Sequence, residues 1–354
     1  MNGNILKLTA YFAERERTGG RFLAEGLLDL FTTPAITSSV MLRGIASFGP
    51  RNIVRTDESL SMSEDPPVTI AAIGPEPAIA AVVDDVVAMT SRGLITLERA
   101  RLADGGMPET GDDAEAVKMT LYVGRQQRAA GRAAHQAACD VFHRLGFAGA
   151  TVFLGVDGTV GGQRRRARFL SRNVDVPTMI VAVGTAAQAS SAATELTGLL
   201  PDPLLTVERV RICKRDGRVI EHPHGLPATD ASGLNIFQML TVYTSEDSLH
   251  DGVPVHRALV RRLRETHQVS GATVLRGLWG FHGDHPPHGD KLFQLGRSVP
   301  VATIVVDTPE AIAHSFAIVD ELTGRHGLVT SERVPARLAL NRGDRHGGTR
   351  LAWG

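Results

Sequence analysis

The sequence is poor in the residues on which disulfide scaffolds and zinc modules depend. The chain has 354 residues and only two cysteines, Cys139 and Cys213. Two cysteines cannot form a disulfide framework or a four-cysteine zinc site, and their scarcity favours a reducing compartment. Neither has an obvious histidine partner in the sequence, and no Gly-x-Ser-x-Gly motif is present. We therefore expect a protein that is not an enzyme, with both cysteines serving as packing residues.

An excess of positive charge and a long apolar run are also missing. The 38 basic side chains equal the 38 acidic ones, which argues against a protein that coats nucleic acid. The most apolar segment, residues 68–89, is interrupted by Pro75, Glu76 and Pro77, and the N-terminus lacks the order of a signal peptide. These absences predict a soluble, cytoplasmic protein that neither binds nucleic acid nor inserts into a membrane.

The chain has just three tyrosines, and they reveal a repeat. Tyr11, Tyr122 and Tyr243 each end a similar apolar run, and a glycine follows each of them nine residues later. Further on come the similar segments SVMLRGI, TVFLGVD and TVLRGLW, then DPPVTIAAI, DVPTMIVAV and SVPVATIVV, and finally LITLERA, LLTVERV and LVTSERV. Ordered landmarks at nearly constant spacing indicate a domain of about 100 residues present in three copies, far longer than a solenoid repeat.

Each copy has the same pattern of elements. In the first copy, alternating or apolar runs predict strands over residues 6–12, 40–48, 68–73 and 94–100, and helical periodicity predicts helices over residues 22–30 and 78–90. Pro67 precedes the third strand, where a missing N–H is tolerated. The order β-α-β-β-α-β predicts an α+β protein of three tandem ferredoxin-like units.

Composition places the boundaries of the copies. We assign repeat 1 to residues 1–103, repeat 2 to 115–213 and repeat 3 to 233–341. Residues 104–114 and 214–232, rich in Gly, Pro and Asp, are predicted to be linkers, and residues 342–354 a C-terminal tail. Repeat 2 is the basic copy, because its Lys and Arg outnumber its Asp and Glu by five.

At these motifs the sequence resembles a known family. LTAYFAERERTGGRFL, MLRGIASFG, LSMSEDPPVTI and LITLERARL, with SGATVLRGLWGFHG and GLVTSERV in repeat 3, resemble the PII-like family catalogued as domain of unknown function 190. Repeat 2 keeps AGATVFLG but has Leu154 where the other copies have Arg43 and Arg276. Its residues 124–127 also replace the acidic turn at residues 14–16.

The resemblance implies a signalling protein. PII-like proteins assemble as trimers, bind effectors, often adenine nucleotides, between subunits, and contact partners through a loop. Some members are encoded beside fluoride exporters, so a membrane transporter or another protein is the implied partner. Three copies in one chain suggest a monomer that forms its own pseudo-trimer, because tethering gives neighbouring copies an effective concentration of order mM.

The first candidate ligand residues lie in the turn before the first helix. Arg15, Arg17, Gly19, Gly20 and Arg21 bring glycine and arginine together at a predicted helix N-terminus, where free N–H groups favour an anion. A tight turn with solvated charges is the alternative, since a glycine pair alone is a weak phosphate signal.

Arg43 and its repeat-3 counterpart Arg276 are further ligand candidates, because each lies in the middle of an apolar strand. A charged residue on a strand faces solvent or pairs with a carboxylate. An ion pair with the glutamate of the closing ERA or ERV phrase is therefore the alternative to ligand contact. Leu154 would then distinguish one cleft from the other two.

Two loops offer other chemistry. Arginine clusters suit phosphate or carboxylate, so the repeat-2 loop is a candidate site for an anion or an acidic partner through Arg164, Arg165, Arg166 and Arg168. The repeat-3 loop carries His282, His285 and His288, which could bind a divalent metal or a partner, or titrate near neutral pH. For both loops, a solvated surface is the alternative. A metal-dependent enzyme built on the histidines and a scaffold that docks an acidic partner are the rivals to the signalling role.

Overall fold

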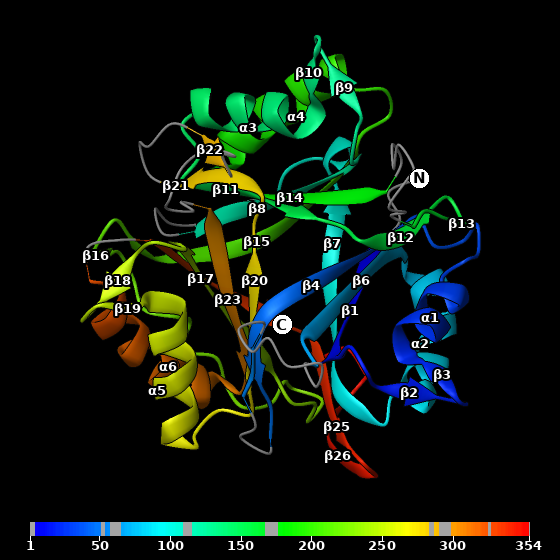
Figure 1. Ribbon diagram of the computed structural model, residues 1–354, viewed down its shortest axis with the longest axis vertical. Helices are drawn as coiled ribbons and strands as arrows, with labels where there is room; N and C mark the ends of the chain where they lie inside the picture. Colours follow the sequence, from blue (N-terminus) through cyan, green and yellow to red (C-terminus); the bar gives the residue numbers. More distant parts are fainter. Residues whose placement is uncertain are drawn as a thin grey trace.

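A computed structural model shows three similar layered units around a common centre (Figure 1). It describes residues 4–50, 54–56, 65–108, 115–166, 176–282, 287–289, 299–324 and 327–353. Three pairs of helices lie on the outside and the strands lie toward the middle (Figure 1). This arrangement follows from amphipathic helices that each cover one face of a sheet.

Repeat 1 contains every element that its sequence predicts. Its elements are β1 (Ile5–Ala13), the short hairpin β2 (Arg17–Thr18) and β3 (Arg21–Phe22), α1 (Leu23–Leu30), β4 (Ser38–Phe48), β5 (Arg55–Thr56), β6 (Pro67–Pro75), α2 (Glu76–Met89) and β7 (Arg92–Leu102). The long strands pair antiparallel in the order β4-β6-β1-β7. Each observed strand is two to four residues longer than predicted, and Pro67 begins β6 as expected.

Repeats 2 and 3 follow the same plan. Repeat 2 comprises β8 (Glu115–Gly124), β9 (Arg128–Ala129), β10 (Arg132–Ala133), α3 (Ala134–Arg144), β11 (Gly149–Leu154), β12 (Asp157–Val160), β13 (Gln163–Arg164), β14 (Pro177–Gly184), α4 (Ala186–Leu199) and β15 (Leu204–Arg215). Repeat 3 comprises β17 (Phe237–Ser245), β18 (Leu249–His250), β19 (Val253–Pro254), α5 (Val255–Thr266), β20 (Ala272–Arg276), β21 (Trp279–His282), β22 (His288–Gly289), β23 (Pro300–Asp307), α6 (Pro309–Thr323) and β24 (Leu328–Val334). The α+β class is thus confirmed.

Neighbouring repeats are joined by strand pairing at their second strands. In repeat 1, the first half of β4 pairs with β12 of repeat 2, and its second half pairs with β20 of repeat 3. In turn, β21 of repeat 3 pairs with β11 of repeat 2. In each repeat, one half of the second strand pairs with one neighbouring repeat and the other half pairs with the other neighbour. These pairings connect the three repeats in a closed ring.

The last strands form a second set of links. The end of β7 pairs with β15, and the end of β15 pairs with β24. After β24 the chain continues into β25 (Ala336–Asn341), which returns to pair with β7, and then into β26 (Asp344–Gly348). The result is one 20-stranded sheet that closes on itself. Although β25 falls within the predicted bounds of repeat 3, it packs on repeat 1.

The linkers carry little regular structure. Residues 103–105 form the short helix η1 (Ala103–Gly105), and β16 (Arg218–Val219) extends β15 as a hairpin. Within the described ranges, no helix is both long and apolar enough to cross a membrane.

Four larger hydrophobic cores and one small cluster, formed by Phe237, Met239, Val306 and Val334, hold these elements together. Each repeat has its own core between its helices and one face of its sheet. A fourth core lies between the sheets and takes residues from all three repeats, among them Tyr122, Phe153, Tyr243 and Leu275. Because both faces of the strands are covered, the strands are apolar along most of their length rather than alternating.

The strand β25 belongs energetically to repeat 1, since Leu338 is 5% exposed and lies in the first core. Replacing Leu338 by alanine should lower the free energy of unfolding by about 2–5 kcal/mol, through lost burial and a residual cavity. Urea denaturation measures this loss. Arg345→Ala, at an exposed position on β26, is the matched control and should change stability by less than about 0.5 kcal/mol. An unchanged L338A protein would contradict the assignment of β25 to this core.

Candidate functional site

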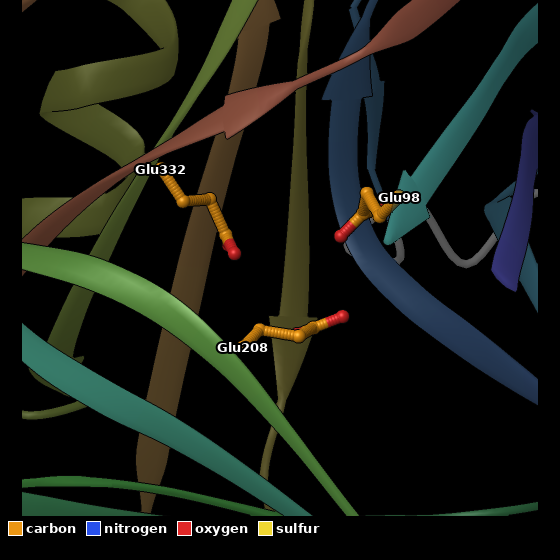
Figure 2. Close-up of side chains that lie close together, drawn as sticks. All are labelled: Glu98, Glu208 and Glu332. Carbon is orange, nitrogen blue, oxygen red and sulfur yellow. The ribbon is translucent and has the colours of Figure 1, made fainter. Parts of the chain in front are cut away.

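Charged side chains from all three repeats meet at the centre of the molecule. Strand pairing places Lys7 opposite Glu98, Lys118 opposite Glu208, and Met239 opposite Glu332. Figure 2 shows the three carboxylates pointing toward one another from β7, β15 and β24. We call Lys7, Lys118, Glu98, Glu208 and Glu332 the ionic centre. Every member except Lys7 is at most 6% exposed, although charges are seldom buried in proteins.

Each lysine of the ionic centre links neighbouring repeats, and Lys118 also lies 3.8 Å from Glu98 of repeat 1. Lys7 Nζ lies 2.6 Å from Glu98 Oε2 and 3.0 Å from Glu208 Oε1. Lys118 Nζ lies 2.6 Å from Glu208 Oε2 and 2.5 Å from Glu332 Oε2. Both therefore contact the glutamate of their own repeat and that of the following repeat. A buried ammonium group is tolerated because several carboxylates offset its desolvation.

Burial and pairing shift the pKa values of these groups in opposite directions. Burial alone would lower the pKa of Lys118, but Glu208 and Glu332 raise it well above its usual range. Burial tends to raise the pKa of Glu208, yet Lys118 and Lys7 lower it to about 2. For Glu332, burial and repulsion from Glu208 and Glu98 prevail over Lys118 and raise the pKa. The equivalent residues Glu208 and Glu332 are therefore electrostatically different.

The ionic centre lines a small cavity. Oxygens of the three glutamates lie within 4.8 Å of one another, close enough to share a metal ion. The two ammonium groups already lie among these oxygens and form ion pairs with them. The cavity beside it has a volume of about 70 Å³ and is also lined by Met239 and three equivalent threonines, Thr9, Thr120 and Thr241.

A larger cavity lies between repeats 1 and 3, which we call the 1/3 cleft. Its volume is about 160 Å³. Its walls come from the end of β1, from β4 and β7, from the start of β20, from the second half of β23, and from β25. Apolar side chains provide much of this lining: Tyr11, Phe12, Phe48, Leu94, Ile304, Val306 and Leu340. A mainly apolar hollow with a few polar groups is typical of a small-molecule site.

The charged groups of the 1/3 cleft are mostly cationic. Arg92 lines the cleft, and its Nε and Nη2 are buried without a hydrogen-bond partner among the described residues. Arg337 is held in place, since its Nε donates to the carbonyl oxygen of Val306 and its Nη2 to Ser270 Oγ. Burial, together with Asp65, raises the pKa of Glu16 at the mouth. Arg92 therefore offers two unsatisfied donors to a ligand.

The equivalent cleft between repeats 2 and 3 is nearly filled. It is lined by Tyr243, Pro300 and Leu328, the counterparts of Tyr11, Pro67 and Leu94, but its volume is only about 10 Å³. Strand pairing places His282 opposite Gly149, where the 1/3 cleft has Gly49 opposite Gly271. The imidazole occupies space that Gly49 leaves open, so the two clefts are not equivalent.

The predicted turn site is arranged differently from expectation. Gly19 and Gly20 form the tip of the β2–β3 hairpin with positive φ values of 54° and 83°, and α1 begins only at Leu23. Arg17 Nη1 donates to the carbonyl oxygen of Gly20, and Arg21 pairs with Asp29 at 2.7 Å. The expectation of a glycine pair at a helix N-terminus was wrong, because two residues of β3 separate the tip from the helix. For Arg15, the backbone N–H donates to Asp65 Oδ1.

Arg43 and Arg276 form ion pairs, but with other partners than the predicted ones. Arg43 pairs with Glu14, and Arg276 pairs with Glu246 at 2.5 Å. The glutamates of the closing ERA and ERV phrases cannot pair with these arginines, because their carboxylates point into the ionic centre. Repeat 2 has Arg125 at the position of these partner glutamates, next to Leu154 in place of the arginine. The two replacements together avoid placing two guanidinium groups side by side.

The arginine loop of repeat 2 contacts the chain itself. Arg164 contacts Glu25, Asp29 and Asp157 at 2.8–2.9 Å, and Arg166 contacts Glu25 at 2.9 Å. Arg165 Nη2 donates to Gln163 Oε1. Arg168 lies outside the described residues. Glu25 and Asp29 belong to α1, so the acidic surface that this loop meets is repeat 1.

The predicted histidine site is only partly described. His282 ends β21 and His288 begins β22, while His285 lies outside the described residues. Among the described residues, the only group of His, Cys, Asp and Glu with suitable spacing for a metal is the glutamate trio. The two cysteines are buried, as expected.

Sequence reasoning missed the ionic centre and Arg92. The closing ERA and ERV phrases were recognised as landmarks, and Lys7 and Lys118 stand four residues before their tyrosines. A charged residue that recurs at one register of an apolar strand was therefore a usable signal. Arg92 has no counterpart in the other repeats, since Asp202 holds its position in repeat 2, and no pattern marks it.

The fold and the repeated centre define a protein of three tandem α+β copies. The model of the family described as domain of unknown function 190, an uncharacterised group, matches residues 5–102, 116–212 and 237–336. The chain belongs to this family. A relative from Aquifex aeolicus (strain VF5), named UPF0166 protein, is 36% identical over 98 residues, which are 27% of this chain and 90% of the relative.

Solved structures are only remotely similar. An anthrone oxidase-like protein is 10% identical with a TM-score of 0.18, over 68% of this chain and 98% of the other. The BBE-like 1 protein of Physcomitrella patens is 8% identical with a TM-score of 0.20, over 89% and 67% of the two chains. Likeness at this level carries no argument about fold or function.

The lysine bridges predict a strong effect of Lys118→Met, which copies the residue of repeat 3 at this position. The free energy of unfolding at pH 7 should fall by about 3–5 kcal/mol, because Glu208 and Glu332 lose a buried partner. The pKa of Glu208, about 2 when folded, lies below its ordinary value, so its stabilisation is present above about pH 4.5 and lost as the pH falls toward 2.

The deficit of K118M should therefore shrink between pH 5 and pH 3 in urea denaturation. Arg209→Met, at the exposed neighbour of Glu208, is the control and should be nearly neutral. A K118M deficit that is absent at pH 7 would show that the bridges contribute nothing to stability.

Proposed function

We propose that the chain is a PII-like regulator whose three ferredoxin-like repeats act as a covalent pseudo-trimer. Membership in the family and the cyclic strand pairing support this arrangement. In this proposal the protein binds a small anionic effector between repeats and regulates a partner. It has no catalytic step, in keeping with the sequence.

The 1/3 cleft is the effector site in this proposal. The observation that carries it is Arg92, whose buried Nε and Nη2 lack partners among the described residues and face a cavity of about 160 Å³. These two nitrogens form one edge of the guanidinium fork, which matches the two oxygens of a carboxylate or phosphate. A buried donor without a partner costs about 1–3 kcal/mol, which a ligand oxygen would recover.

The effector class follows from the lining. Tyr11, Phe48 and Leu94 offer apolar surface to a flat or apolar group, and Arg92 offers a cation to an anionic one. Adenine nucleotides combine both features and are the effectors that the family resemblance suggests. Arg17, Arg21 and Arg43 are less suited to first contact, because their guanidinium groups already bind the carbonyl oxygen of Gly20, Asp29 and Glu14.

Regulation of a partner is the second half of the proposal. An effector can shift a loop only if it binds one loop state more tightly than another. The segment after β4 supplies Gly49, Pro50 and Arg55 to the 1/3 cleft, so an occupant would touch the base of that loop directly. A transporter, such as a fluoride exporter, or another protein would then bind one state of that loop in preference to the other.

Calorimetry of the full chain against ATP, ADP, AMP and cyclic AMP tests this proposal. We expect one of them to bind in the 1/3 cleft and not in the cleft between repeats 2 and 3, whose volume is only about 10 Å³. Arg92→Met should weaken binding about tenfold or more, the usual effect of losing a hydrogen bond to a charged group.

Arg209→Met, an exposed arginine remote from this lining, is the matched control and should bind like the original chain. Absence of heat with all four compounds would reject the nucleotide version. Binding that is unaffected by R92M would move the site out of the 1/3 cleft.

A further inference from the structure

The ionic centre has two ammonium groups for three carboxylates. Lys7 links Glu98 to Glu208, and Lys118 links Glu208 to Glu332. By the same rule a third lysine, on β17, would link Glu332 to Glu98 and complete the cycle. Met239 stands at that position, opposite Glu332 in the strand pairing. If all five groups were ionised, the ionic centre would carry one uncompensated negative charge.

An uncompensated charge at this depth is very unfavourable. Glu98 is 3% exposed and Glu332 is 6% exposed, so water cannot solvate them well. The thioether of Met239 has no charge and cannot donate a hydrogen bond. Two carboxylates in one buried site share a proton when no cation pairs closely with both, and the ammonium group nearest to Glu332, that of Lys118, is 3.8 Å from Glu98.

We propose that Glu332 binds one proton at neutral pH, in place of the third ammonium group that Met239 lacks. The proton neutralises the ionic centre and leaves Glu98 and Glu208 ionised, each with a lysine. Glu332 is the favoured carrier because a single lysine, Lys118, contacts it, whereas Glu208 is contacted by both lysines. Nothing in this inference depends on an effector in the 1/3 cleft.

The charged and titratable groups around Glu332 are consistent with this assignment. Lys118 on β8 and Lys7 on β1 favour its ionised form, while Glu208 on β15, Glu98 on β7 and burial oppose it, and together they raise its pKa. Tyr11, Tyr122 and Tyr243 lie close enough to interact with the ionic centre, and burial raises the pKa of each far above neutral pH. The tyrosines therefore stay neutral while Glu332 titrates.

The bound proton makes the centre of the molecule sensitive to alkaline pH. The folded-state pKa of Glu332 is raised above its unfolded value, so its proton stabilises the fold fully below the unfolded pKa. That contribution is lost as the pH rises through the folded pKa, and the unfolding equilibrium constant increases by up to tenfold per pH unit along the way.

Two substitutions test the proposal by urea denaturation of the full chain from pH 5.5 to 9.5. Glu332→Gln keeps the neutral shape, so it should leave stability near pH 6 almost unchanged and remove this part of the pH dependence. Met239→Lys supplies the missing ammonium, so it should stabilise the chain at pH 9 relative to the original. Comparing variant and original at each pH cancels the titration of unrelated groups.

Glu208→Gln is the matched control, because it makes the same chemical change at an equivalent position. Since Glu208 is ionised and contacted by both lysines, E208Q should raise the unfolding equilibrium constant at least a hundredfold at pH 7. Equal destabilisation by E332Q and E208Q, or parallel pH profiles for E332Q and the original chain, would overturn the proposal.

A direct readout covers the case in which a variant folds poorly. Infrared spectra at pH 7 should show a protonated-carboxyl band in the original chain that is missing in E332Q and M239K. A metal cation in the same place is the competing outcome. Stability that depends on Na⁺ or K⁺, compared with choline at equal ionic strength, together with no protonated-carboxyl band, would replace the proton by that cation.

Discussion

The buried ion pairs between lysines and glutamates of neighbouring repeats are the constraint on which the rest of the structure depends. Lys7 and Lys118 each pair with carboxylates on different repeats. The three sheets can therefore pack together in one relative position only. Hydrophobic burial alone would tolerate small slips between sheets, whereas an unpaired charge at this depth would not. Specificity in the assembly of the repeats thus comes from charge, and stability comes mainly from the four cores.

Fusion of three copies into one chain has allowed them to diverge at matched positions. Met239 replaces a central lysine, and Leu154 with Arg125 replaces an arginine–glutamate pair. In repeat 2, the arginine loop forms ion pairs with α1 of repeat 1 through Arg164. The changes in repeat 2 fit their local partners, whereas Met239 leaves Glu332 without a lysine opposite it. The clefts differ for the same reason, with His282 on one side and Gly49 on the other.

Much of the fold could be predicted from the sequence, and little of the candidate site could. Strands and helices have their own periodicity, so the β-α-β-β-α-β order and Pro67 at the start of β6 were recognisable locally. The ion pair of Arg43 was foreseen as an alternative, but not its partner Glu14, because pairing depends on which residues the fold brings together. Arg92 could not be predicted as a site residue, because a single arginine at the start of a strand belongs to no recurring sequence pattern.

The sequence by itself determined the three copies, the α+β class and the family, because repeats and periodicity are properties of residue order. Only the tertiary structure decided that β25 pairs with β7 of repeat 1, that the 1/3 cleft stays open, and that three glutamate carboxylates lie together at the buried centre. Those outcomes depend on contacts between residues 100 or more positions apart, and such contacts are set by the packing of whole sheets rather than by any local stretch of chain.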